Sequence, residues 1–63
     1  MKVRDIVKRL KSEGWVSVGT EGSHEHFTHP AMPGKVTVPS GHGANVDLKP
    51  GTLRNIERMA GWR

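Results

Sequence analysis

The sequence has no cysteine, no long apolar run and few acidic residues, and each absence narrows the possibilities. Without cysteine, disulfides and thiolate metal sites are excluded, and the redox compartment is left undetermined. Apolar stretches stay far below the ~20 residues that a membrane span needs, so we expect a soluble protein without a membrane segment. Residues 1–5 lead directly into amphipathic sequence and do not resemble a signal peptide, which favours a cytoplasmic location.

Length and charge set the next limits. The 63 residues are enough for one domain, residues 1–63. A domain this short buries only about 60% of the surface that its unfolded chain exposes, so we expect a small core. Ten lysine and arginine residues against six acidic ones give a formal net charge of +4. This balance favours an anionic partner, nucleic acid above all, although many small domains are basic for solubility alone.

Apolar spacing predicts two amphipathic helices, one near each end of the chain. The first should end at Gly14, and its inner face carries residues at i, i+3, i+4 and i+7: Val3, Ile6, Val7 and Leu10. The second should begin at Pro50 and end at Gly61. Its inner face carries Leu53, Ile56 and Ala60. Because neither helix can bury its apolar stripe alone, both should pack on one face of a sheet.

Three short segments between the helices have the residue types of strands. They are residues 15–18, 24–29 and 35–38. Turn residues at 19–22 and 30–34 separate them, and residues 40–47 have the composition of a longer loop. Short turns between successive strands predict an antiparallel meander. The expected fold class is therefore α+β, in the order helix-strand-strand-strand-helix, with a three-stranded sheet whose second face is open.

The interior of this fold should be thin, because few large apolar residues are left to fill it. Four strand valines are expected there: Val16, Val18, Val36 and Val38. The aromatic residues are Trp15, Phe27 and Trp62. Their rings could stack on bases, but in so small a core we expect them to pack against the valines.

The four histidines are His24, His26, His29 and His42, and the first three lie close enough in sequence to raise the question of zinc. Alternation along a strand places His24 and His26 on one face and His29 on the other. No familiar zinc-ligand spacing is present either. We therefore expect no metal site and no cofactor.

A serine nucleophile is the next possibility, because Ser23 precedes His24. Adjacent strand residues point to opposite faces, so His24 is badly placed to act as a base for Ser23. The strand-turn-helix elbow of serine hydrolases and the glycine-rich phosphate loop of nucleotide hydrolases are both missing. Ser23 is better placed as a turn hydroxyl or a phosphate contact.

RNA cleavage without a metal ion is the chemistry that is left. The ribose 2′-hydroxyl attacks the neighbouring phosphate, and the protein has only to move protons and stabilise charge. An imidazole can exchange a proton near neutral pH, and His24 is our candidate for one of the two proton transfers. From the residues alone, a hairpin histidine bonded to the backbone is an equal alternative.

Six residues are candidates for contacts with RNA: Gly22, Ser23, His26, Lys35, Lys8 and Lys11. Gly22 would let the backbone come close to a ligand. His26 shares the face of His24, and Lys35 could lie opposite on the neighbouring strand. Lys8 and Lys11 form a second stripe on the first helix together with Arg4, and such a stripe can equally be a solvated face.

Three sequence blocks resemble a known family. The first is Gly22-Ser23-His24 with Phe27 and His29-Pro30, the second is Val36-Thr37-Val38-Pro39, and the third runs from Leu48 to Ile56. In this order and spacing they resemble the HicA toxins of HicA–HicB toxin–antitoxin systems. The resemblance covers nearly the whole chain.

The resemblance implies a fold similar to the double-stranded RNA-binding domain. It implies a ribonuclease that cleaves messenger RNA and arrests translation, with the histidine of the Gly-Ser-His motif, here His24, as the catalytic residue. It also implies a HicB-like antitoxin that binds the toxin and blocks this site. A non-catalytic RNA-binding module of the same fold is the alternative.

The sequence departs from the family pattern at two points. Residues 19–21, just before the triplet, are Gly-Thr-Glu, where the family often has basic residues. His42 stands one residue further from Pro39 than the second histidine of the family. We therefore carry over no role for His42.

Overall fold

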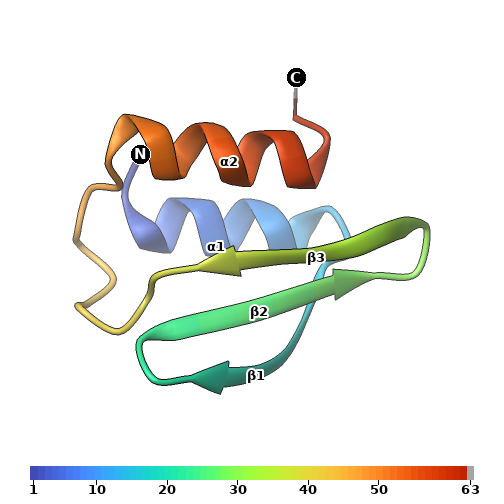
Figure 1. Cartoon of the computed structure of the whole chain (residues 1–63), viewed down its shortest axis with the longest axis horizontal. Coiled ribbons are helices and arrows are strands. Elements are labelled where there is room, and N and C mark those ends of the chain that lie inside the picture. The colour runs from blue at the N-terminus through green and yellow to red at the C-terminus, as the bar shows by residue number, and fades with distance from the viewer. Residues whose placement is uncertain (63) are drawn as a thin grey trace.

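The computed structural model describes residues 1–62 and contains five elements in the predicted order. They are α1 (Val3–Ser12), β1 (Val16–Glu21), β2 (His24–His29), β3 (Met32–Val38) and α2 (Pro50–Ala60). The strands form one antiparallel sheet in the order β1-β2-β3. Both helices lie on the same side of the sheet, and α2 runs along β3 (Figure 1). The predicted α+β fold is confirmed, while the last residue of the expected domain 1–63 lies outside the described residues.

The core lies between the helices and the sheet. Its buried side chains are Val3, Ile6 and Leu10 of α1, Ile56 and Ala60 of α2, Phe27, Val36 and Val38 of the strands, and Trp15. Each large side chain that is fully buried stabilises the fold by roughly 1.5–3 kcal/mol. Val7, Leu48, Leu53 and Trp62 pack against this core and are partly buried. The predicted inner faces of both helices and the packing role of the aromatic residues are therefore confirmed.

β1 contributes no buried side chain, and the prediction that its valines fill the interior is wrong. Val16 and Val18 each expose 59% of their surface. Val16 is paired with Thr28 and therefore lies on the face away from Phe27. Val18 falls at an irregularity in the register between β1 and β2 and has no partner.

The predicted strand ends are wrong at two places. The turn expected at 19–22 is formed by Gly22 and Ser23, so β1 continues to Glu21. Gly22 has φ 59°, at the first turn position, where two-residue hairpins of type II′ take glycine. β3 begins at Met32 instead of residue 35 and includes Pro33. It is an edge strand, where a proline without an N–H group is tolerated.

His29 connects the end of α1 to the sheet. Its Nε2 donates to the carbonyl oxygen of Glu13 at 2.8 Å, and its Nδ1 accepts the N–H of Ala31 at 2.9 Å. These two partners require a neutral ring with its hydrogen on Nε2. The ring also meets Trp15 edge-on, with centroids 5.3 Å apart. His29 therefore points toward α1, as strand alternation predicts.

Trp62 ties the end of α2 to the end of α1. Its indole N–H donates to Glu13 at 2.6 Å, and the Arg9 guanidinium lies 4.1 Å from the centroid of its ring. Arg9 also bonds Glu13 at 3.0 Å. The hydrogen bond from Trp62, followed by that from Arg9, holds the pKa of the Glu13 carboxyl below its ordinary value.

Candidate active site

The face of the sheet opposite the core carries the polar side chains of β2. Phe27 is fully buried, so His24 and His26 project from the opposite face. The register places Glu21 of β1 beside His24, and Thr37 of β3 beside His26. The strand pairing therefore gathers two histidines, a carboxylate and a hydroxyl on one surface, which we call the open face.

Hydrogen bonds fix His26 in the middle of the open face. Its Nδ1 lies 2.9 Å from Thr37 Oγ1, and its Nε2 lies 2.9 Å from Glu21 Oε1. An ionised carboxylate only accepts hydrogen bonds, so Nε2 carries a hydrogen. The side chain of His26 is only 15% exposed. The His26 ring therefore links all three strands, with both of its nitrogens engaged.

His24 lies at the start of β2 and is exposed to solvent. Its ring makes no hydrogen bond to any of residues 1–62, whereas His26 and His29 each use both ring nitrogens. Within the described residues, His24 is the one histidine of β2 whose ring nitrogens are both available to a ligand. An exposed imidazole with two free nitrogens can accept or donate a proton.

The loop at residues 39–45 rests directly on the turn that precedes His24. The Gly41 N–H donates to the Ser23 carbonyl oxygen at 2.9 Å. A Cβ atom on Gly41 would lie only 2.5 Å from the Ser23 Cα, which is closer than two such atoms approach in proteins. By contrast, a Cβ on Gly22 would have nothing within 4 Å. The turn is therefore supported on the Ser23 side and open at Gly22.

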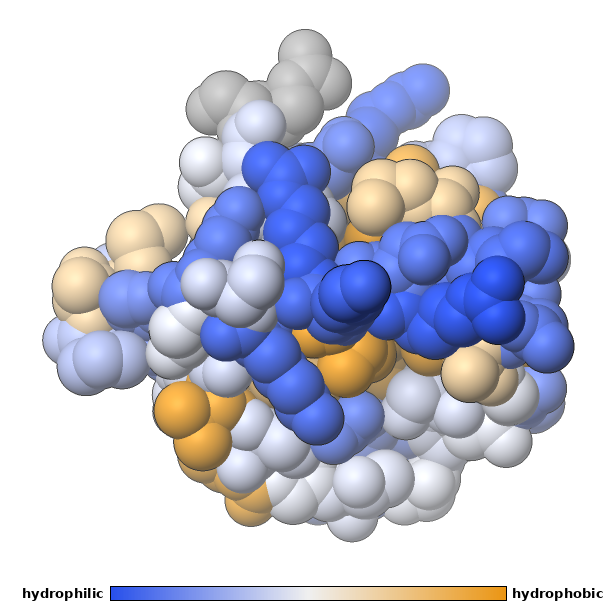
Figure 2. Space-filling view, turned by 180° about the vertical axis from the view of Figure 1, so that it is seen from behind, coloured by the Kyte–Doolittle hydropathy of each residue, from blue (hydrophilic) through white to orange (hydrophobic). Residues whose placement is uncertain are grey.

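Lys8 and Lys11 lie apart from the open face, in a groove between α1 and the 39–45 loop. The groove has a volume of ≈ 460 Å³, with cations Arg4, Lys8 and Lys11 and with apolar Val3, Val7 and Ala44 in its wall. In the view from behind, hydrophilic side chains border a small apolar area (Figure 2). Glu25 also lines the groove and directly follows His24. The groove thus reaches the end of β2 that carries His24.

The predicted RNA contacts fall into three places. Gly22 and Ser23 form the turn before His24, His26 and Lys35 share the open face with His24, and Lys8 and Lys11 belong to the groove. Lys35 pairs with Thr28, so its expected place opposite His24 and His26 is wrong. Glu21 and Thr37, which hold His26, were missed because only the strand register brings them together. Gly41 was missed because glycine in a loop has no sequence signal for close packing.

Neither a cluster of metal-binding side chains nor a membrane-spanning helix is present among the described residues. In residues 1–62, no three histidine, aspartate or glutamate side chains lie close enough together to hold a metal ion. Neither α1 nor α2 is long and apolar enough to cross a membrane. Strand alternation is the geometric reason that His29 stands away from His24 and His26.

Comparison with known proteins identifies the family. Residues 3–62 match the family model of the HicA toxin of bacterial toxin–antitoxin systems. A search of curated proteins finds no match. The matched span includes the turn before His24, the loop with Gly41 and both helices. The chain therefore belongs to the HicA toxin family and is a toxin with an antitoxin partner, as its three sequence blocks indicate.

Proposed function

We propose that this toxin is a metal-independent endoribonuclease that cleaves messenger RNA, with His24 as a general acid or base, and so arrests translation and growth. The observation that carries the proposal is the free imidazole of His24 beside an open glycine turn. The family places the chain among toxins, and its net charge of +4 suits a polyanionic target.

The proposed reaction needs two proton transfers and stabilisation of negative charge. The 2′-oxygen of one ribose attacks the adjacent phosphorus, the bond to the 5′-oxygen breaks, and a 2′,3′-cyclic phosphate forms. A neutral His24 can take the 2′-proton, or a protonated His24 can supply a proton to the departing 5′-oxygen. Backbone N–H groups of the turn before His24 can stabilise the charge of the phosphorane. Lys35 pairs with Thr28, about 13 Å along the sheet from His24, and is placed for a neighbouring phosphate.

The loop around Gly41 supports the turn from which His24 would act on RNA. His24 follows the turn directly, and the turn is held by the contact between Gly41 and Ser23. Gly22 leaves space for the phosphate to approach the backbone. The imidazole therefore projects from a supported turn, while the approach to it is open.

We also propose that a HicB-like antitoxin covers His24 and meets the basic surface with acidic residues, because the toxin carries a net charge of +4. Hydrogen exchange of the free toxin and of the complex tests this. Protection of residues 22–26 is the expected result. An unprotected turn, or a cocrystal structure with His24 open to solvent, would contradict it.

One experiment separates the candidate functions. Purified toxin is incubated with RNA in EDTA, and the fragment ends are analysed. An endoribonuclease of this type leaves 2′,3′-cyclic phosphates. A non-catalytic RNA-binding module, to which the basic groove is also suited, binds RNA without fragmenting it. A protein-interaction module shows little RNA affinity and a weak dependence on salt, whereas phosphate contacts weaken steeply as salt rises.

A further inference from the structure

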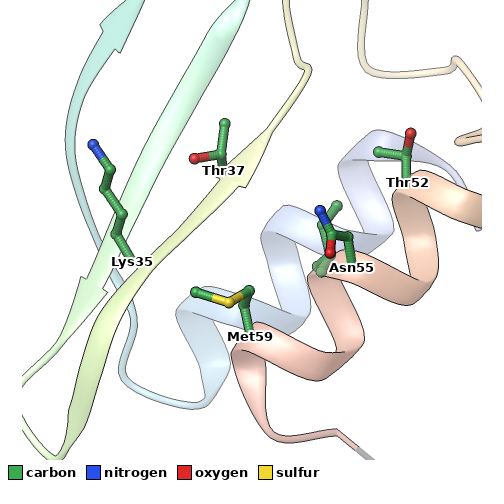
Figure 3. A pocket seen from close by; sticks show the side chains of 6 residues that line it. Lys35, Thr37, Thr52, Asn55 and Met59 are labelled. Atoms are coloured by element: carbon green, nitrogen blue, oxygen red, sulfur yellow. The ribbon is translucent and has the colours of Figure 1, made fainter.

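A polar pocket lies between β3 and α2 and has no part in the reaction described above. Its volume is ≈ 230 Å³, and it is lined by Lys35, Thr37, Thr52, Asn55, Ile56 and Met59. In Figure 3, Met59 reaches from α2 toward β3, and Lys35 and Thr37 rise from β3 beside it. Ligand pockets commonly enclose about 300–1,000 Å³, so this one suits part of a larger ligand.

The pocket combines an apolar floor with a polar rim. Ile56 is almost fully buried, and Met59, which is 41% exposed, has the flexible side chain that adapts to a flat ring. Asn55 Oδ1 accepts a hydrogen bond from the Arg58 guanidinium, so the NH₂ group of this amide is left as a donor. Thr52 adds a hydroxyl. An aromatic ring with hydrogen-bond acceptors along its edge fits these groups.

Two residues connect the pocket to the open face. Thr37 lines the pocket and lies within hydrogen-bond distance of His26, the neighbour of His24 on that face. Lys35 alternates with the buried Val36 and projects from the same face of β3 as Thr37. A strand of RNA that reaches His24 can therefore continue past His26 to the pocket and pair a phosphate with Lys35.

We propose that this pocket binds one nucleotide of the RNA substrate next to the cleaved phosphate. The base lies over Ile56 and Met59, its edge faces Asn55 and Thr52, and its phosphate lies near Lys35. Proteins recognise single-stranded RNA in this way, by holding unstacked bases and bonding their edges. The inference rests on the proposed ribonuclease function and assigns the β3–α2 pocket as its base-recognition subsite.

Binding is tested in a His24→Ala protein, so that the RNA stays intact. Anisotropy of a labelled single-stranded RNA is measured for this protein and for versions with Asn55→Ala or Lys35→Ala added. We expect each addition to weaken binding several-fold, and Lys35→Ala to reduce the salt slope by about one. Ser12→Ala, which removes an exposed hydroxyl at the end of α1 and outside the pocket, should leave binding unchanged. Unchanged binding in both pocket variants, with melting temperatures like that of the parent, overturns the inference.

Base preference is tested in the cleaving protein by sequencing fragment ends from a randomised RNA. We expect the chain to prefer particular bases at one position beside the cut, and Asn55→Ala or Thr52→Val to relax that preference by about fivefold or more. If the chain cleaves and both variants keep its preference at every position, the pocket is not a subsite. If the chain does not cleave RNA, the proposed function fails, and the binding measurement still decides the role of the pocket.

Discussion

Replacing Gly41 with alanine should disrupt the support of the turn that carries His24. Gly41 does not have a positive φ, so its backbone conformation is open to any residue. Position 41 requires glycine only because there is no room for a side chain. An added Cβ would lie 2.4 Å from the Ser23 Cβ and 2.5 Å from the Ser23 Cα. Because the Cα is backbone, it cannot rotate away, and either the loop or the turn must move.

The size of the effect follows from these contacts. Forcing an extra carbon into a packed site costs about 1–3 kcal/mol. If the loop moves away instead, the bond from Gly41 N–H to the Ser23 oxygen is lost, at a net cost of about 0.5–1.5 kcal/mol. At about 0.05–0.15 kcal/mol per residue, a chain of this length has about 3–9 kcal/mol of stability. The variant should therefore fold, with much less stability than the parent chain.

Urea unfolding measures this loss, and Gly51→Ala is the matched control. Gly51 lies in α2 without a positive φ, and a Cβ there would have nothing within 4 Å. Alanine at Gly51 should leave stability equal or higher, because glycine within a helix is unfavourable. If Gly41→Ala is as stable as Gly51→Ala, the loop does not rest on the turn as described.

Two further predictions concern stability. Hydrogen bonds from Trp62 and Arg9 lower the pKa of Glu13 from its ordinary value of 4.5, so the stabilisation from this carboxylate is complete above pH 4.5 and is lost as the pH falls through the lowered pKa. In the Glu13→Gln variant, the free energy of unfolding in urea should fall less steeply as the pH decreases below 4.5. The difference should be small because the group is exposed. An equal pH dependence in the variant and the parent would contradict this prediction. Phe27→Ala removes a fully buried ring and should cost about 3–5 kcal/mol. Near-ultraviolet circular dichroism should show that tertiary packing is lost. A free energy of unfolding close to that of the parent would contradict the described core.

The sequence was sufficient to predict the order of elements and the inner faces of the helices. Each helix repeats apolar residues at helical spacing, and this local pattern fixes which side is buried, as Leu10 and Ile56 show. The strand ends depend on pairing instead. Val18 loses its partner at the irregular register, and Met32 joins β3 because it pairs with His29. Pairing between separate segments is not visible in the local sequence pattern, so the sequence did not predict these strand ends.

The sequence also predicted only part of the candidate site. Strand parity placed His24 and His26 on one face and His29 on the other, because alternation is a property of a single strand. The groups that hold this face are contributed by other segments. Thr37 lies 11 residues from its partner His26, and the Gly41 contact depends on how the loop folds back onto Ser23. Only the three-dimensional arrangement shows that His24 differs from the other two histidines of β2 in having free nitrogens.

The most direct test of the central claim is the rate of RNA cleavage by the chain and by His24→Ala, measured in EDTA on the same RNA. His42→Ala, an exposed histidine in the loop, is the control for loss of an imidazole. We predict that His24→Ala yields no fragments and no growth arrest, while its unfolding transition matches that of the parent and His42→Ala still cleaves. Undiminished cleavage by a folded His24→Ala protein would exclude His24 from the mechanism.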